Sequence, residues 1–143
     1  MRTIGHGRWM ATLLAHITVK PGKEVEWEDI CRTLYAATHD SEPAMRRYEY
    51  WRGAEPRSYY TLLSFDDHRS FVVHQTSDHH EDAAPNIGAC VESIRLEFVD
   101  PIQGASDLVP TEHQPAPDDA DELTKTYTER YAASVAEWWA ALR

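Results

Sequence analysis

The sequence has little positive charge, few cysteines and no long hydrophobic run, and each shortage excludes a class of protein. Its 14 lysines and arginines are outnumbered by 24 aspartates and glutamates, which gives a formal net charge of −10. Nucleic acids and anionic membranes are bound by clustered cations, so we expect neither partner. No stretch approaches the roughly 20 apolar residues of a membrane span, and residues 1–8 do not resemble a secretion signal. We therefore predict a cytoplasmic location.

The two cysteines, Cys31 and Cys90, are not arranged for chemistry. Neither belongs to a Cys-x-x-Cys pair, and neither has an acid-base partner nearby in the sequence. Both lie in apolar segments of helical pattern, where a buried reduced thiol is more common than a disulfide or a nucleophile. We therefore predict two free, buried thiols.

The length and patterning of the chain indicate one domain. With 143 residues, of which 42% are hydrophobic, the chain can bury a core of ordinary size. Alternating apolar residues predict four strands, at residues 9–20, 45–52, 59–65 and 93–100. Helical periodicity predicts two helices, at residues 23–38 and 68–74. This β-α-β-β-α-β order predicts an α+β fold of ferredoxin-like type, with an antiparallel sheet and two helices on one face.

Four further segments lie outside these elements or between them. Residues 1–8 are expected to form a mobile arm, and Pro85 is expected to break any long helix over residues 81–90. The ferredoxin-like domain is placed at residues 9–103, and a Pro-, Asp- and Ser-rich linker with little structure follows at 104–120. Residues 121–143 then predict one C-terminal amphipathic helix, which either folds back on its own sheet or reaches a second subunit.

Short motifs along the chain have a recognisable order. They are Val-Lys-Pro-Gly-Lys at residues 19–23, Ser-Glu-Pro-Ala at 41–44, Arg-Tyr-Glu at 47–49, Phe-Val-Val-His at 71–74 and Ser-Asp-His at 77–79. In this order, over roughly residues 11–100, they resemble the antibiotic biosynthesis monooxygenase family. That family usually has Glu-Pro-Gly where this chain has Glu-Pro-Ala. It also has two histidines separated by four residues, as His74 and His79 are here.

The resemblance implies a dimeric α+β barrel, in which two sheets of a homodimer pack face to face. The side chains expected in the barrel between the subunits are Leu14, His16, Tyr60 and Leu62. The side chains expected to face the helices, where the family keeps its substrate cavity, are Leu13, Ala15, Thr61, Leu63 and Phe65.

The family resemblance also implies cofactor-independent oxidation of small electron-rich aromatics such as quinols and anthrones, with dioxygen and without metal, haem or flavin. The substrate supplies the electrons, so the protein needs a base, a hydrogen-bond donor and a dry aromatic-lined cavity. His74 is the candidate base, because an imidazole titrates in the useful range. Tyr48 and Tyr59 are the candidate donors. The candidate substrate-binding residues are Trp27, Leu63, Phe65 and His79.

Plainer interpretations compete with this one. His74 could instead pack or cap the short helix. His79 and His80 could lie in a solvated loop, and Tyr48 and Tyr59 could be ordinary core aromatics. Many family members carry Glu and Trp where this chain has Leu63 and Phe65. A non-catalytic dimeric domain of the same fold, which binds a small molecule or has a regulatory role, is therefore the second hypothesis.

The sequence indicates neither a haem site nor a metal site. The haem-degrading relatives have an asparagine and a histidine where this chain has Ala15 and Ala84. Six possible metal ligands lie close in the sequence, namely His68, His74, His79, His80, Glu81 and Asp82. However, His74 and His79 are five residues apart across an expected helix end, whereas a helical ligand pair needs a spacing of four.

Overall fold

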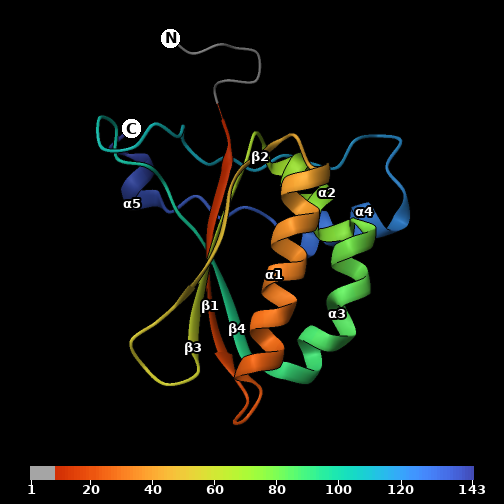
Figure 1. The fold of residues 1–143 in the computed structure, drawn as a ribbon. Helices are drawn as coiled ribbons and strands as arrows, with labels where there is room; N and C mark the ends of the chain where they lie inside the picture. Colours follow the sequence, from red (N-terminus) through yellow and green to blue (C-terminus); the bar gives the residue numbers. More distant parts are fainter. Residues whose placement is uncertain (1–8) are drawn as a thin grey trace.

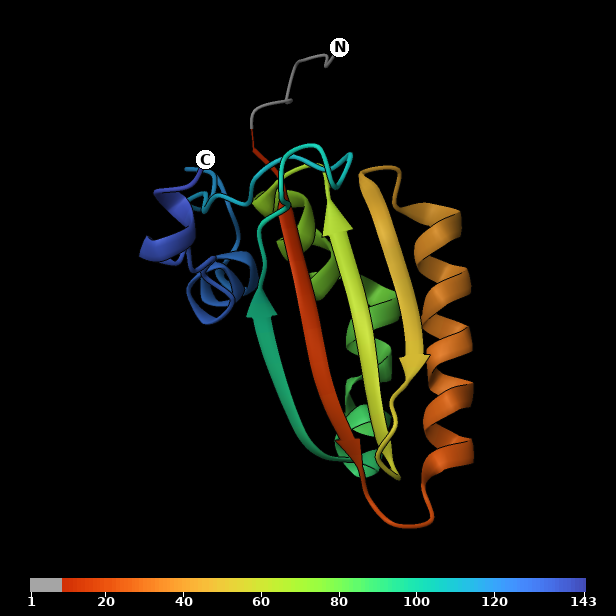
Figure 2. The same ribbon diagram turned by 90° about the vertical axis from the view of Figure 1, so that its left-hand side faces the viewer.

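The computed structural model describes residues 9–143, so the predicted mobile arm over residues 1–8 lies outside the described residues. Four antiparallel strands form one sheet in the order β2-β3-β1-β4, which is the ferredoxin-like α+β arrangement expected from the sequence. The strands are β1 (Ala11–Val19), β2 (Met45–Arg52), β3 (Ser58–Phe65) and β4 (Val91–Phe98). Three helices lie on one face of this sheet (Figure 1), and the described residues leave the middle of the other face open (Figure 2).

The alternation along the central strands separates the two faces as predicted. On β1, Leu13 and Ala15 are almost fully buried beneath the helices, whereas Leu14 and His16 are half-exposed on the open face. Register places Ala15 beside Thr61 of β3, and both belong to the helix-covered face. This face is therefore apolar except where a few polar side chains, such as Thr61, are enclosed.

Helix α1 (Glu24–Ser41) buries one stripe and ends at a proline. Its buried residues, Trp27, Cys31, Leu34 and Thr38, recur at helical spacing and face the sheet. The residue before a proline is pushed out of the α region, so Glu42, which precedes Pro43, leaves the helix with φ −118° and ψ 88°. Its backbone N–H donates to the carbonyl of Thr38 at 3.0 Å. The end of α1 thus fixes Glu42 beside the sheet.

A serine divides the region after β3 into two helices, α2 (His68–Thr76) and α3 (Asp78–Cys90). Asp67 caps α2 by accepting from the Ser70 N–H, and Ser77 caps α3 by accepting from the His80 N–H. Ser77 has extended backbone angles, so α3 leaves in a new direction. This turn brings His74, at the end of α2, close to His79 in the first turn of α3.

The prediction that Pro85 breaks the helix was wrong, because Pro85 lies inside α3. A proline within a helix costs about 3 kcal/mol relative to alanine. Ala83 and Ile87, on the same helix, pack against the core, and α3 packs along α1. Burial of this apolar face offsets the cost of the proline.

The segment over residues 104–120 runs along the strand ends without a helix of its own. Thr111 is fully buried and holds it there: its hydroxyl donates to the Val99 carbonyl at 2.8 Å and accepts from the Thr12 N–H at 3.1 Å. Met10 pairs with Thr111 in an isolated parallel bridge. The division into a domain over residues 9–103, a linker and an extension stays a prediction.

The single helix predicted over residues 121–143 was wrong, because the chain forms α4 (Glu122–Arg130) and α5 (Glu137–Ala140) instead. Helix α4 ends at Arg130, and the carbonyl of the next residue, Tyr131, accepts a hydrogen bond from Nε2 of the buried His68 at 2.9 Å. The Tyr131 ring packs edge-on against Phe71, with centroids 5.9 Å apart. Tyr131 is therefore bound to α2 rather than to another turn of its own helix. Trp138, farther along the expected stripe, is exposed.

Two smaller predictions can also be compared with the structure. Cys31 and Cys90 are buried free thiols, as expected, and burial raises the pKa of the Cys31 thiol. None of the helices within residues 9–143 has the length and apolarity needed to span a bilayer.

Candidate functional site

A cavity of about 310 Å³ lies between the helix-covered face of the sheet and helices α1 and α3. This volume is at the lower end of the range of about 300–1,000 Å³ that is usual for ligand pockets, so it suits a small molecule. All four strands contribute to its wall, together with α1, α2, α3 and one residue that follows α4. Its polar residues include Tyr48, Tyr50, Thr61, His74 and His80. Most of the remaining wall is aliphatic or aromatic.

His74 is fully buried at the edge of this cavity. Its ring lies between Tyr48 and Phe65, with centroid distances of 4.9 Å and 5.1 Å. The hydroxyl of Ser77 donates to the His74 carbonyl at 2.7 Å and fixes the end of α2. The imidazole is therefore held in one position by aromatic packing and by the helix end.

Glu42 joins His74 to His79. Its Oε2 lies 3.0 Å from Nδ1 of His74 and 2.6 Å from Nε2 of His79. Burial raises the pKa of this carboxyl, but the hydrogen bonds and charges of the two imidazoles lower it by more, so the net shift is downward. Glu42 is therefore an ionised acceptor at neutral pH.

The ionised carboxylate determines the tautomer of His74. Because Glu42 accepts the proton on Nδ1, the neutral ring carries its lone pair on Nε2. That nitrogen is buried and has no hydrogen-bond partner among residues 9–143. The arrangement of an orienting carboxylate, an imidazole and a free nitrogen at a cavity is that of a general base.

Tyr48 and Tyr50 form a hydroxyl pair on the cavity wall, with 2.5 Å between their oxygens. Burial raises the pKa of both phenols, so both stay protonated. Their mutual hydrogen bond uses one of the two protons. Both hydroxyls belong to residues that line the cavity, so a ligand oxygen there could accept the other proton.

The remaining predicted site residues are divided by the structure. Trp27 and Leu63 line the cavity with His74 and Tyr48. Phe65 packs against the His74 ring, and His79 contacts that ring edge-on and is also joined to it through Glu42. His79 and His80, for which solvated positions were the alternative, are both partly buried.

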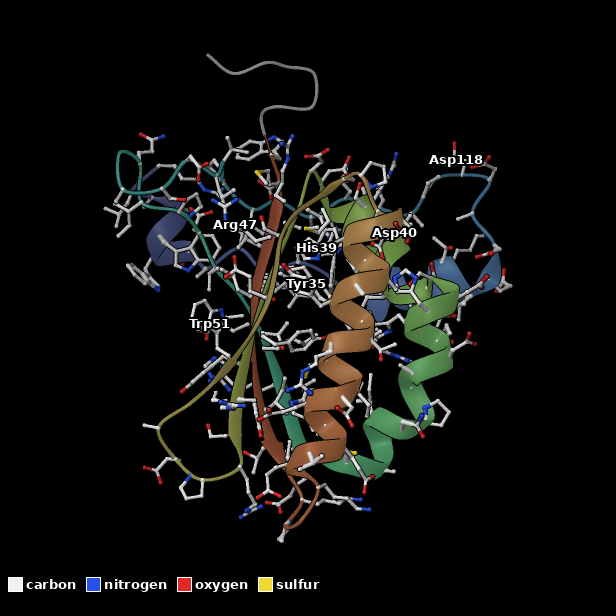
Figure 3. All side chains as sticks on the ribbon, viewed as in Figure 1. Tyr35, His39, Asp40, Arg47, Trp51 and Asp118 are labelled. Atoms are coloured by element: carbon white, nitrogen blue, oxygen red, sulfur yellow. The ribbon has the colours of Figure 1, made fainter. Side chains whose placement is uncertain are left out.

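Tyr59 belongs to a different place. Its hydroxyl donates to Glu28 Oε2 at 2.8 Å, and burial with this hydrogen bond raises the pKa of the phenol to about 12. Hydrogen bonds from Arg52 and Tyr59 lower the pKa of Glu28 to about 2. The three side chains line a separate groove between α1 and the β2 edge, to which Trp51 also contributes. Figure 3 shows Trp51 on the side of β2 away from α1.

Sequence reasoning missed three residues of the site. Glu42 was noted as part of a Glu-Pro pair but was given no role, and Thr61 was assigned only to a face. His80 lines the cavity, and burial together with the charges of His74 and His79 lowers its pKa to about 4. His80 is therefore neutral at pH 7. Nothing in the local pattern indicated its burial, since Asp78 in the same first turn of α3 is exposed.

Glu42, His74 and His79 also form a possible metal-ligand set, since their ligand atoms lie within 4.8 Å of one another. The sequence argument did not consider Glu42, and it did not anticipate that the turn at Ser77 brings the two histidines together. In the structure both imidazoles point a nitrogen at the same carboxylate oxygen. A divalent cation would have to replace both hydrogen bonds and separate these atoms, because zinc binds its ligands at about 2.0–2.2 Å in a tetrahedron.

Comparison with protein families gives one match: the model described as "Antibiotic biosynthesis monooxygenase" matches residues 10–86. A search of curated proteins found no match. Among solved structures, a Pseudomonas aeruginosa protein is similar with a TM-score of 0.63 and 21% identity, over 68% of this chain and 99% of its own.

Two other solved structures are similar in the same way. A candidate antibiotic biosynthesis monooxygenase from Caulobacter crescentus has a TM-score of 0.63 and 22% identity, over 67% of this chain and 92% of its own. A Mycobacterium tuberculosis protein has a TM-score of 0.62 and 14% identity, over 68% of this chain and 99% of its own. At such identities the likeness concerns the fold alone. Each of the three covers about two thirds of this chain.

Proposed function

Because the chain belongs to the antibiotic biosynthesis monooxygenase family, we propose that it is an oxidoreductase, a cofactor-independent monooxygenase of a small aromatic of quinol or anthrone type. The observation that carries this proposal is the buried His74, with Nδ1 paired to ionised Glu42 and Nε2 unpartnered at an apolar cavity. A positioned base beside an apolar cavity is what oxidation of a phenolic substrate by dioxygen requires.

The reaction begins when Nε2 of His74 removes a proton from the bound phenol or from the acidic C–H of its keto form. Glu42 stabilises the imidazolium that results, and the hydroxyl pair of Tyr48 and Tyr50 donates to the developing oxyanion. The substrate anion then passes one electron to dioxygen. The radical pair combines through a new C–O bond to give a peroxide anion.

The proton held by His74 returns to that peroxide. The O–O bond of the hydroperoxide then breaks, and the outer oxygen leaves as water together with the remaining hydrogen of the same carbon. That carbon becomes a carbonyl. One oxygen atom of dioxygen thus enters the product and the other leaves as water. The electrons come from the substrate, so the balance needs no further reductant.

We also propose that two copies of the chain associate through the open face of the sheet. Leu14, His16, Tyr60 and Leu62 lie on that face and are only half-exposed, so it is less polar than a freely solvated surface. The net charge and the reduced thiols favour the cytoplasm as the compartment.

The test is oxygen uptake by the purified protein with a panel of quinols and anthrones. We expect uptake with at least one compound, and a loss of about 10²-fold or more in His74→Ala. His39→Ala, in which an exposed histidine of α1 is removed, is the matched control, with circular dichroism to verify the fold of both variants. Figure 3 shows His39 on α1 one turn from Tyr35, with which it stacks at 3.8 Å.

Leu63 favours the second candidate, a non-catalytic domain that binds a small molecule or has a regulatory role. It lines the cavity at the strand position where many family members carry a glutamate, so this part of the wall offers no acid. Binding of several panel compounds without oxygen uptake by any of them would contradict the enzyme and support this alternative.

A further inference from the structure

We propose that Trp27 and Thr61 form a second polar subsite in the cavity, which binds a neutral acceptor oxygen at the end of the ligand opposite His74. This inference rests on the proposed function, in that the ligand is taken to be an aromatic held by its hydroxyl at His74. It adds what the other end of that ligand must carry.

Four buried polar side-chain atoms within residues 9–143 have no hydrogen-bond partner: Trp27 Nε1, Thr61 Oγ1, His74 Nε2 and His80 Nδ1. All four residues line the same cavity. Native proteins leave few buried polar atoms unpaired, because each one loses its hydration without compensation. Their concentration around one cavity indicates a ligand that supplies the missing partners.

The four residues belong to two ends of the cavity. His74 and His80 lie together, with ring centroids 5.1 Å apart, and His74 also contacts Phe65 at the end of β3. Trp27 contacts Tyr59 near the start of β3, with centroids 6.3 Å apart. Residues four apart on a strand are separated by about 13 Å, which is the distance from Thr61 to Phe65 along β3. A ligand must therefore be elongated to reach both ends.

The chemistry of each end is different. The indole N–H of Trp27 can only donate, and the Thr61 hydroxyl can donate or accept, so this pair suits a carbonyl or similar acceptor oxygen. When its Nδ1 proton is held by Glu42 and Nε2 carries no proton, His74 accepts through Nε2, so it suits a phenolic O–H. The ligand that satisfies both is an aromatic with a hydroxyl at one end and a carbonyl oxygen at the other.

The ligand is also expected to be uncharged. No lysine, arginine, aspartate or glutamate of residues 9–143 lines the cavity. A carboxylate or ammonium group would therefore be buried there without a countercharge, which is far more costly than burying a hydrogen-bonded carbonyl.

The test uses two fused-ring phenols that differ in one group: an acetyl-naphthol and the corresponding ethyl-naphthol, each with its two substituents at opposite ends of the rings. Trp27→Phe removes the N–H and keeps an aromatic ring, and Thr61→Val replaces the hydroxyl with a methyl group of similar size. Binding is measured by isothermal titration. The matched control is Trp51→Phe, since Trp51 is exposed and does not line this cavity.

We expect each of the two variants to bind the acetyl compound roughly 3- to 10-fold more weakly, which corresponds to one lost hydrogen bond. Binding of the ethyl compound should change less than twofold. Without ligand, Thr61→Val should unfold at the same or a higher temperature, because it removes an unpaired buried hydroxyl.

Equal losses for both compounds, no loss for either, or no binding of the acetyl compound by the parent protein would overturn the subsite. These outcomes are separate from a failure of the proposed function. A selective loss of acetyl-naphthol affinity in a protein that consumes no oxygen would retain the subsite and refute the monooxygenase.

Discussion

Replacing Glu42 with glutamine keeps the size of the side chain but removes the charge that His74 and His79 share. A hydrogen bond to a charged group contributes about 1.5–3 kcal/mol to stability, and a neutral one about 0.5–1.5 kcal/mol. Each hydrogen bond to residue 42 therefore loses about 1 kcal/mol of stabilisation in the variant. Two such bonds reach the carboxylate, at 3.0 Å and 2.6 Å. We therefore expect the free energy of unfolding of E42Q to be about 2 kcal/mol lower than that of the parent protein at pH 7.

The pH dependence gives the sign of this effect independently. The pKa of Glu42 is lowered in the folded protein from its ordinary value of 4.5, because the imidazole partners outweigh burial. The stabilisation by its ionised form is therefore complete above the unfolded pKa and is lost as the pH falls through the folded pKa. The difference between E42Q and the parent protein should be largest near neutrality and should close in acid.

The assay is urea unfolding followed by circular dichroism at neutral pH and at a series of lower values. Glu55→Gln is the control, since Glu55 is exposed in the β2–β3 loop. Equal stability of E42Q and the parent protein at pH 7, or a difference that widens in acid, would refute the conclusion that Glu42 is an ionised, doubly bonded acceptor.

Three other predictions concern the C-terminal segment and the histidines. Tyr131→Ala should lower the free energy of unfolding by about 2 kcal/mol, about half the usual cost for a fully buried aromatic, and should admit bulkier ligands in titrations, since Tyr131 is partly buried and lines the cavity. His68→Phe should cost about 1–3 kcal/mol, because the buried ring bonds the backbone of Gln114 and Tyr131, and limited proteolysis should then cut residues 104–136 faster, with His113→Phe as the comparison. Dialysis against a chelator should leave oxygen uptake unchanged, whereas a loss that Zn²⁺ or Fe²⁺ restores would show that Glu42, His74 and His79 hold a metal.

The sheet could be predicted because its signal is local. Alternation on β1 and β3 assigned Leu13, Ala15, Thr61 and Leu63 to the helix-covered face, and the register in the structure agrees. The prediction of one C-terminal helix was wrong because a periodic apolar pattern does not show which distant side chain will bind the backbone. His68, 63 residues earlier, binds the carbonyl of Tyr131, the residue after the last residue of α4.

The candidate site was only partly predictable. His74 could be identified because its residue type and its place in the Phe-Val-Val-His motif at the end of the predicted helix suggested a base. Glu42 lies 32 residues from His74 in the sequence, so their contact depends on how the end of α1 meets the end of α2. Tyr59 shares the face of Thr61 and Leu63 but is bonded to Glu28, which alternation along a strand cannot reveal.

Tyr131 touches two things at once: its ring borders the cavity and packs on Phe71, while its carbonyl is bound to His68. A molecule that packs against this ring gains that contact only while the segment around Tyr131 is docked on α2. Binding in the cavity and docking of this C-terminal segment are therefore thermodynamically linked. The linkage is reciprocal, and each process must favour the other by the same factor.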